Sequence, residues 1–375
     1  MTKVPRSMRP PSESDTATAV VYCEGNFGKI DGKTANGLVR HSERFVIQSV
    51  IDSEHAGEDA GVVLGDDPRG IPICRDLASA LAIGGSPPEV FIFGMAPATG
   101  MLTAGERTLV LEAMALGMHV VNGLHEFLSD DPEFTAASAN SNVWIDDIRK
   151  PRAKTDLRMF SGRIDSVSCP RIAVLGTDCA IGKRTTATIL ARCLNEQGIK
   201  TVLVGTGQTG LMQGARYGVA LDAVPSQFCS GELEASVVAA FENETPDVII
   251  IEGQGSLSHP AYSTSALILR GCHPDAVVLQ HAPARQHRCD FENMPMPEPA
   301  TEIHLIETFA PTKVIGLTIN HENMLPHEVD AAITRYQEQL RLPVTDALTG
   351  STSRLIDMVV AAFPQLEARL ATRRL

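Results

Sequence analysis

The segment from Gly176 to Thr186, with the sequence GTDCAIGKRTT, has the composition of a phosphate-binding loop. It follows the apolar run RIAVL, and a helix is expected over the residues after it, ATILARCLNEQG. Glycines allow backbone N–H groups to point inward, the start of a helix carries partial positive charge, and Lys183 adds a mobile cation. A Gly-Lys pair indicates a phosphate-binding loop when a strand precedes it and a helix follows it. We therefore predict a phosphate-binding loop, with an ordinary glycine-rich turn as the alternative.

Two features of this loop depart from the common pattern G-x-x-x-x-G-K-[ST]. Five residues separate the two glycines, and Arg184 stands where a magnesium-binding Ser or Thr is usual. A hydroxyl displaced to Thr185 or Thr186 weakens the case for a tightly held magnesium nucleotide. The case for a phosphate-bearing ligand is unaffected. The expected ligand contacts are Gly176, Thr177, Asp178, Ala180, Gly182, Lys183, Arg184, Thr185 and Thr186.

Polar residues also follow other apolar runs in the second half of the chain. Because ligands of open α/β sheets lie beyond the carboxyl ends of the strands, these residues are candidates for the same site. Glu252 ends the run DVIIIE, where it could hold a metal, act as a base or cap the next turn. Gln208 and Gln254 lie among glycines and could donate amide N–H groups to a cofactor, or simply form turns.

Two further residues of this kind are His259 and Asn320. His259 precedes Pro260 and is a candidate base or oxyanion donor, with a structural role as the alternative. Asn320 ends the run KVIGLTIN, at a position where P-loop proteins often read a purine base. No metal site is predicted, because the remaining candidates lack a recognisable ligand spacing: His273, His281, His287 and Cys289.

Alternating apolar runs and helix-length segments predict two α/β domains with mostly parallel sheets. In the first half, strands are expected at 18–22, 44–51, 90–94 and 119–123, with helices at 33–40 and 105–116. In the second half, strands are expected at 171–176, 201–205, 247–253, 276–281 and 313–320. A basic segment bounded by prolines separates the halves. We assign residues 1–16 to a disordered tail, 17–150 to the first domain, 151–170 to a linker and 171–375 to the second domain.

Asn122 and His125 follow one of the predicted strands of the first half. They could face a cleft between the halves, where small substrates often bind, so both are candidate substrate-binding residues. Gly25–Gly28 together with Asp52 faintly suggests a dinucleotide fingerprint but lacks its first Gly-x-Gly pair. A nicotinamide cofactor is therefore not predicted.

The overall composition excludes several classes of protein. Hydrophobic residues make up 43% of the 375 residues and charged residues 21%, which are values of a globular protein. A net charge of −13 argues against nucleic acid as a partner, and no apolar run is long enough for a membrane span. The tail lacks the apolar core of a signal peptide, and the eight cysteines form no CxxC pair, so we expect a cytoplasmic protein. A small-molecule substrate and a homo-oligomer are also expected.

The motifs resemble those of two families. GTDCAIGK and IEGQGS are similar to segments of dethiobiotin synthetase, an ATP-dependent ligase. A second family resembles nearly the whole chain, through GNFGKIDGKTANGL, VVNGLHEFLSDDPEF, GTDCAIGKRTTA, GTGQTG, EGQGSLSHPAY and INHENM. Its members are bacterial two-domain P-loop proteins that were long without a known function, and they include a D-glutamate N-acetyltransferase. This resemblance implies a Rossmann-like N-terminal domain and a P-loop NTPase-like C-terminal domain.

The second resemblance also implies an acetyl-CoA-dependent transfer to the amine of D-glutamate or a close D-amino acid. A P-loop can hold the phosphates of coenzyme A without hydrolysis and without a bound metal, and Arg184 would add a contact. Gln254 or backbone amides would stabilise the oxyanion. His259 is the preferred base, with Glu252 orienting it or serving in its place. An ATP-dependent ligase or kinase and a non-catalytic acyl-CoA or nucleotide sensor are the alternatives.

Overall fold

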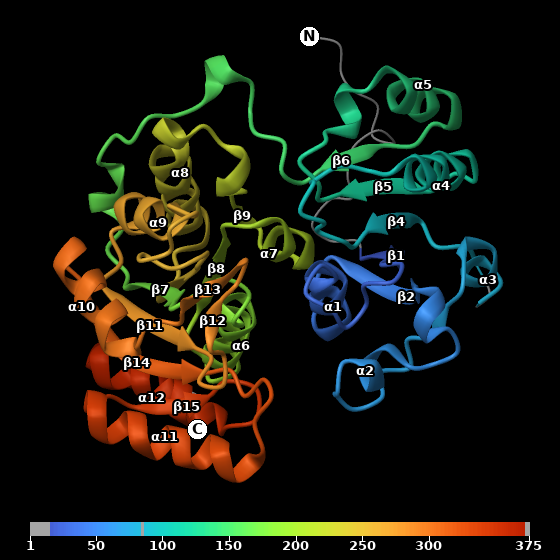
Figure 1. Cartoon of the computed structure of the whole chain (residues 1–375). Helices are drawn as coiled ribbons and strands as arrows, with labels where there is room; N and C mark the ends of the chain where they lie inside the picture. The colour runs from blue at the N-terminus through green and yellow to red at the C-terminus, as the bar shows by residue number, and fades with distance from the viewer. Residues whose placement is uncertain (1–15, 84–85, 372–375) are drawn as a thin grey trace. The chain divides into compact units, whose positions relative to one another are not determined.

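The computed structural model describes residues 16–83 and 86–371, so residues 1–15 of the predicted tail lie outside the described part of the chain. The chain divides into two compact units. The first comprises the residues up to Lys150 together with Gln208–Gly214, and the second comprises Pro151–Gly207 and the residues from Ala215 onward. Each unit contains its own sheet and helices (Figure 1).

The first unit is built on a six-stranded parallel sheet with the order β3-β2-β1-β4-β5-β6. In that order the strands are Ile73–Cys74, Phe45–Ile51, Ala17–Tyr22, Val90–Phe93, His119–Asn122 and Ile145–Asp147. The strand order reverses beside β1, as in Rossmann-like folds. The longer helices are α1 (Lys33–Arg40), α4 (Ala104–Ala115) and α5 (Pro132–Ser141), and the shorter ones are α2 (Ala60–Val63) and α3 (Leu77–Leu81). The strands and helices predicted for this half are confirmed to within one residue at each end.

The core of the first unit lies on both faces of its sheet. Consecutive strand residues point to opposite faces, and Val20 and Val21 of β1 are both fully buried, as are Phe91 and Ile92 of β4. Strands buried on both faces consist of continuous apolar runs, because neither face meets water. This is why the central strands were visible in the sequence.

Helix α7 (Gln208–Gln213) packs on the first unit, although it lies within the range predicted for the second domain. Gln213 Nε2 donates to the carbonyl oxygens of Gly37 at 2.7 Å and His41 at 2.8 Å, at the end of α1. The hydroxyls of Thr209 and Thr34 are 3.0 Å apart. The chain therefore returns once to the first unit between two strands of the second.

The second unit contains a seven-stranded parallel sheet with the order β15-β14-β11-β7-β10-β8-β9. In that order the strands are Val344–Asp346, Lys313–Ile319, Ala276–His281, Arg171–Gly176, Val248–Glu252, Thr201–Gly205 and Tyr217–Gly218. A small antiparallel hairpin pairs β12 (His287–Arg288) with β13 (Phe291–Pro295). The helices are α6 (Lys183–Glu196), α8 (Ser226–Glu244), α9 (Thr264–Cys272), α10 (Pro299–Phe309), α11 (Pro326–Leu340), α12 (Thr352–Ala362) and α13 (Glu367–Ala371).

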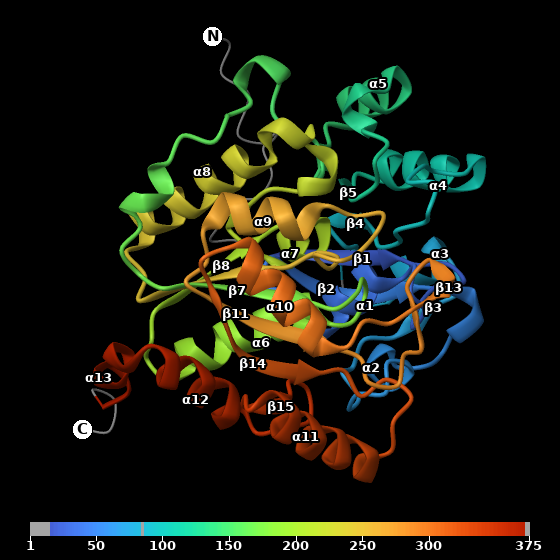
Figure 2. The same ribbon diagram turned by 60° about the vertical axis from the view of Figure 1, so that its left-hand side comes forward.

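Strand β7 lies at the centre of this sheet with helices on both faces (Figure 2). Ile172 and Val174 share a buried cluster with Leu190 of α6 and Val359 of α12. Ala173 and Leu175 point the other way, into a cluster that includes residues of α8 and α9. Along the chain, the strands that follow β7 lie first on its β10 side and then on its β11 side. The carboxyl end of β7 is therefore the switch point, where open α/β sheets bind ligands.

The five strands predicted for the second half are confirmed, and four short ones were missed: β9, β15 and the two strands of the hairpin, β12 and β13. Strands β9 and β15 have two and three residues and leave no apolar run in the sequence. Helix α6 begins at Lys183 and not at residue 187, because Gly182 adopts a φ of 100° that lets the helix start directly after the loop. Among the described helices, none combines the length and apolar character that crossing a membrane requires.

Candidate functional site

The segment Gly176–Gly182 leaves β7 and enters α6 directly. Ala180 and Gly182 have positive φ angles of 50° and 100°, the alternation that forms anion-binding concavities in P-loops. A Cβ at Gly176 would lie 2.9 Å from Ile181 Cδ1 and 3.1 Å from the carbonyl oxygen of Gln280, so a larger residue would have to displace its neighbours. Within the described residues, no side chain caps α6 and no acid occupies its first turn. The loop and the start of α6 therefore present an open anion-binding site.

Lys183 lies inside this loop with only 5% of its surface exposed. Its Nζ donates a hydrogen bond to the carbonyl oxygen of Asp178 within the loop. Burial lowers the pKa of Lys183, and the neighbouring Cys179 and Asp178 oppose that shift. The loop thus buries the lysine side chain, and an anion that binds there would compete with the Asp178 carbonyl for its ammonium group.

The hydroxyl groups of two threonines of the loop form hydrogen bonds with the sheet beneath it. Thr177 Oγ1 is 2.9 Å from Nδ1 of His281, and Thr186 Oγ1 donates to Oε1 of Gln280 at 2.6 Å. Both partners lie at the carboxyl end of β11. Thr185 and Arg184 are half-buried in the first turn of α6. These threonine bonds hold the backbone of the loop against the end of β11.

Glu252 is buried at the end of β10 beside the loop. Its Oε2 accepts hydrogen bonds from the amides of Thr206 at 2.9 Å and Gly207 at 3.3 Å. Burial raises the pKa of Glu252, while those amides and the charges of Arg184 and Lys183 oppose the shift. Gln254 Nε2 donates to the carbonyl oxygen of Thr206. Glu252 and Gln254 therefore hold the turn after β8. The carboxyl group of Glu252 takes up a proton at a higher pH than that of an exposed glutamate.

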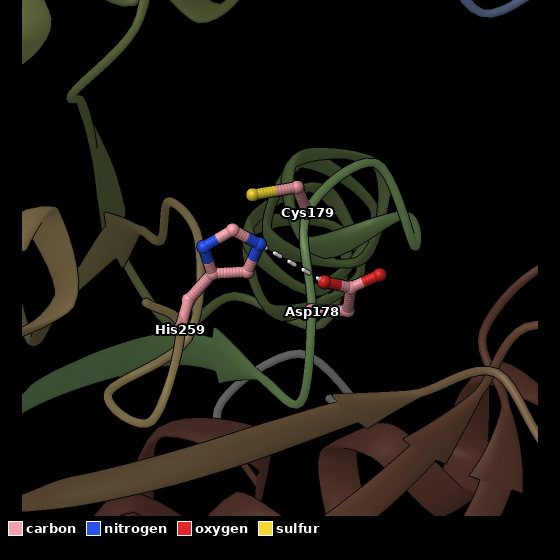
Figure 3. A group of neighbouring side chains, drawn as sticks. All are labelled: Asp178, Cys179 and His259. Carbon is pink, nitrogen blue, oxygen red and sulfur yellow. Dashed lines mark ion pairs between the residues drawn. The ribbon is translucent and has the colours of Figure 1, made fainter. Parts of the chain in front are cut away.

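His259 faces Asp178 in a buried pair beside the loop (Figure 3). Its Nε2 lies 3.5 Å from Asp178 Oδ1, and within the described residues neither atom has a hydrogen-bond partner. Nδ1 of His259 accepts a 3.2 Å hydrogen bond from the amide of Ala261, which assigns the proton of the neutral ring to Nε2. Burial lowers the pKa of His259, with Asp178 opposing the shift. In its neutral form the ring therefore carries its proton on Nε2 and can donate from there.

Asp178, Cys179 and His259 each place one potential ligand atom within 4.8 Å of the others, a spacing that could hold a metal ion. An ion bound at Nε2 of His259 would require the ring proton on Nδ1, where the N–H of Ala261 already points. The hydrogen bonding of the cluster therefore suits a proton on Nε2 better than a metal. The prediction that the protein needs no bound metal stays a prediction.

Two arginines at the loop were missed by the sequence reasoning. Arg285 contacts Asp178 and the loop carbonyls, and Arg288 donates to Ser256 Oγ at 3.1 Å and Ser258 Oγ at 2.7 Å. Their only signal in the sequence is a basic run, ARQHR, that follows β11. Nothing local to that run indicates that β11 pairs with β7 and so brings these side chains to the loop.

Asn320 and Gln208 are the remaining predicted cofactor contacts. Asn320 Oδ1 accepts from the amide of Glu322 at 3.0 Å, and its Nδ2 donates to Glu322 Oε2 at 3.2 Å. Both polar ends of the side chain are thus occupied by one neighbour. Gln208 is buried at the start of α7, which belongs to the first unit. Their predicted cofactor contacts stay predictions.

The two candidate substrate residues belong to the first unit. Asn122 is fully buried at the end of β5, where its Nδ2 donates to Asp147 Oδ1 and to the carbonyl oxygen of Glu126, both at 2.7 Å. His125 is exposed, and its Nε2 lies 2.6 Å from Nη1 of Arg149. Asn122 therefore holds the loop after β5 in place. Of the two residues, His125 is the one exposed to solvent.

Comparison with known proteins relates both units to one family. The model of a P-loop domain of unknown function, DUF1611, matches residues 158–356, and the model of its N-terminal companion, a Rossmann-like domain, matches residues 53–151. This chain belongs to the DUF1611 family. Membership confirms the resemblance to two-domain P-loop proteins, and the Rossmann-like and P-loop fold classes are confirmed with it.

Three relatives show how far the similarity extends. A D-glutamate N-acetyltransferase of a Pseudoalteromonas species is 31% identical over 274 residues, which is 72% of this chain and 80% of that protein. A D-glutamate N-acetyltransferase of Tritonibacter scottomollicae is 29% identical over 73% of this chain and 81% of its own length. The crystal structure of a DUF1611 family protein from Anabaena variabilis is 31% identical, covers 92% of this chain and all of that one, and superposes with a TM-score of 0.85.

Proposed function

We propose that this N-acetyltransferase moves an acetyl group from acetyl-CoA to the amine of D-glutamate or a close D-amino acid. Two relatives that are D-glutamate N-acetyltransferases, each similar over most of its length, support D-glutamate as the acceptor. The observation that carries the donor is the start of α6, where Lys183 lies beside amides that no described side chain caps and where the first turn holds no acid. A site of this kind binds the phosphates of a cofactor.

In this proposal the loop holds the phosphates of coenzyme A. Lys183 would exchange its bond with the Asp178 carbonyl for a phosphate oxygen, and Arg184 would add a second cation. The hydroxyls of Thr177 and Thr186 would keep their bonds to the sheet. The chemistry does not hydrolyse a phosphate, so the proposal needs no magnesium ion at the loop.

The transfer step needs an oxyanion donor and a base. The nitrogen of the free amine attacks the thioester carbonyl carbon, and the carbon–sulfur bond breaks. A base takes the proton that the nitrogen loses, and this proton then converts the leaving thiolate of coenzyme A to the thiol. The proton on Nε2 of His259 suits the donor role. The raised pKa of Glu252 suits the base. We therefore propose His259 as donor and Glu252 as base, whereas the sequence favoured His259 as base and Gln254 or backbone amides as donor.

The length of coenzyme A constrains this scheme. Its pantetheine arm separates the thioester from the phosphates, whereas Glu252 and His259 both lie beside the loop. A folded-back arm is therefore part of the proposal. If the arm is extended, the acetyl group reacts away from the loop, and substitutions of Lys183, Glu252 and His259 would all raise the KM for acetyl-CoA without lowering kcat.

The test is a binding and turnover assay on the purified full chain. Acetyl-CoA is expected to raise the Tm without magnesium, and a chelator is not expected to reverse that effect. Mass spectrometry is expected to show N-acetyl-D-glutamate, with release of the free thiol of coenzyme A in equal amount. Stabilisation by ATP only with magnesium would favour the ligase, and stabilisation by acetyl-CoA without turnover of any amino acid would favour a sensor.

A further inference from the structure

Arg285 contacts the backbone of the phosphate-binding loop from the segment that follows β11. Its Nη1 donates to the carbonyl oxygen of Cys179 at 2.9 Å and to Asp178 Oδ2 at 3.1 Å. Its Nη2 donates to the carbonyl oxygen of Ala180 at 3.3 Å. One guanidinium group thus contacts three consecutive residues of the loop.

The other edge of the same guanidinium is held by Glu322. Arg285 Nε donates to Oε1 of Glu322 at 2.7 Å, and Nη2 donates to Oε2 at 2.9 Å. Asn320 in turn binds the backbone and carboxylate of Glu322 at the end of β14. A bidentate pair of this geometry fixes both the position and the plane of the arginine. Asn320, Glu322 and Arg285 therefore form a continuous connection from β14 to the loop.

The direction of the loop carbonyls decides where its amides point. In a trans peptide the C=O and the following N–H point in opposite directions, and no cis peptide occurs among the described residues. Because the carbonyls of Cys179 and Ala180 point to Arg285, the N–H groups of Ala180 and Ile181 point away from it. Within residues 16–83 and 86–371, these two N–H groups donate to no other group. They are available to a ligand.

The backbone of Ala180 needs such support. Its φ of 50° lies in the left-handed region, which is unfavourable for a residue with a Cβ. A free loop would relax from this conformation, and the amides would lose their common direction. The hydrogen bond from Arg285 to the Ala180 carbonyl opposes that relaxation.

We propose that Arg285 is a positioning residue of the anion-binding site. It turns the loop carbonyls outward so that the amides of Ala180 and Ile181 face the ligand, and Glu322 and Asn320 hold it in place. The proposal rests on the binding of acetyl-CoA phosphates at the loop, as set out above. It also gives Asn320 a role in bracing the loop, in addition to its predicted role as a cofactor contact.

The test compares Arg285→Ala, Arg285→Lys and Glu322→Gln with Arg171→Ala as a matched control. Arg171 lies at the opposite end of β7, where it forms a two-point pair with Asp275 and donates to the carbonyl oxygen of Ile164 at 3.0 Å. Its side chain is 12% exposed, against 15% for Arg285. The control therefore removes a similar guanidinium network from the same unit without touching the loop.

Arg285→Ala is expected to raise the KM for acetyl-CoA and its calorimetric Kd at least about tenfold, since several charge-assisted contacts that shape the site are lost. The KM for D-glutamate is expected to change less than about twofold, because the amides act on the phosphates alone. Lysine keeps the charge but cannot bridge two carbonyls and a carboxylate, so Arg285→Lys should lie between Ala and wild type. Glu322→Gln should resemble the lysine variant.

The proposal is overturned if Arg285→Ala binds acetyl-CoA like the wild type, or if Arg171→Ala weakens binding equally. Inorganic pyrophosphate serves as a second probe, because it needs only the loop. If wild type binds pyrophosphate but not acetyl-CoA, and Arg285→Ala loses pyrophosphate, the positioning role stands and the proposed donor fails. If wild type binds neither probe, both proposals are refuted.

Discussion

Replacing Lys183 by methionine removes one charge from the loop while keeping the aliphatic stem that packs against Gly176. A charge-assisted hydrogen bond is worth about 1.5–3 kcal/mol and a neutral one about 1 kcal/mol. Because Lys183 already donates to the Asp178 carbonyl, ligand binding exchanges one bond for a stronger one. The net loss should therefore lie near the lower end of the range, a roughly tenfold rise in Kd for acetyl-CoA. Isothermal titration calorimetry measures it directly.

The same substitution weakens ligand binding but is not expected to lower the stability of the ligand-free protein. Burial lowers the pKa of Lys183 in the folded state, so the unfolded chain binds more protons between the lowered pKa and the ordinary one. The cost of burying the charge is therefore fully present below the lowered pKa and fades as the pH rises through that window. Lys183→Met should match or exceed the wild-type Tm at pH 7, and it should lose this alkaline gain in stability.

The control for both effects is Lys200→Met. Lys200 lies on the same unit and is half-exposed beside Glu244, away from the loop. It should leave the Kd unchanged. An unaltered Kd in Lys183→Met would refute the reasoning, because the phosphates would then bind elsewhere. A Tm lowered by several degrees in Lys183→Met alone would show that the buried ammonium stabilises the loop.

The remaining predictions concern the transfer step and acid stability. Glu252→Gln is expected to lower kcat at least about a hundredfold and to remove the acid limb of the pH–rate profile, which should lie above the ordinary pKa of glutamate. His259→Ala is expected to lower kcat by roughly 10²–10³ while the acid limb remains, and an unchanged kcat would exclude it as the oxyanion donor. Burial lowers the pKa of His281 to about 4, with Arg335 adding to the effect. The unfolded chain therefore binds the extra proton between about pH 6.5 and 4, and stability should fall by about 3 kcal/mol as the pH drops through that window. Urea unfolding of His281→Gln should show a smaller fall, and an equal fall would mean that other groups cause it.

The sequence by itself determined the central strands of both sheets and the position of the loop. Segments such as 90–93 and 248–251 consist of consecutive apolar residues, which a sheet buried on both faces requires. The spacing of Gly176, Gly182 and Lys183 between a strand and a helix is equally local. Patterns of this kind lie within a few residues of the chain, so they can be read without knowing which strands pair.

Only the tertiary structure decided what surrounds that loop. Arg285 reaches Asp178 across 107 positions of sequence, and it does so because β11 pairs with β7. The order of the strands likewise brought His259 against Asp178, buried Lys183 and engaged Glu252 with the turn after β8. The protonation of His259 depended on a single amide, that of Ala261, whose direction comes from the folded loop. Long-range pairing and the direction of individual hydrogen bonds have no local signature, and these two determined which predicted residues could share one site.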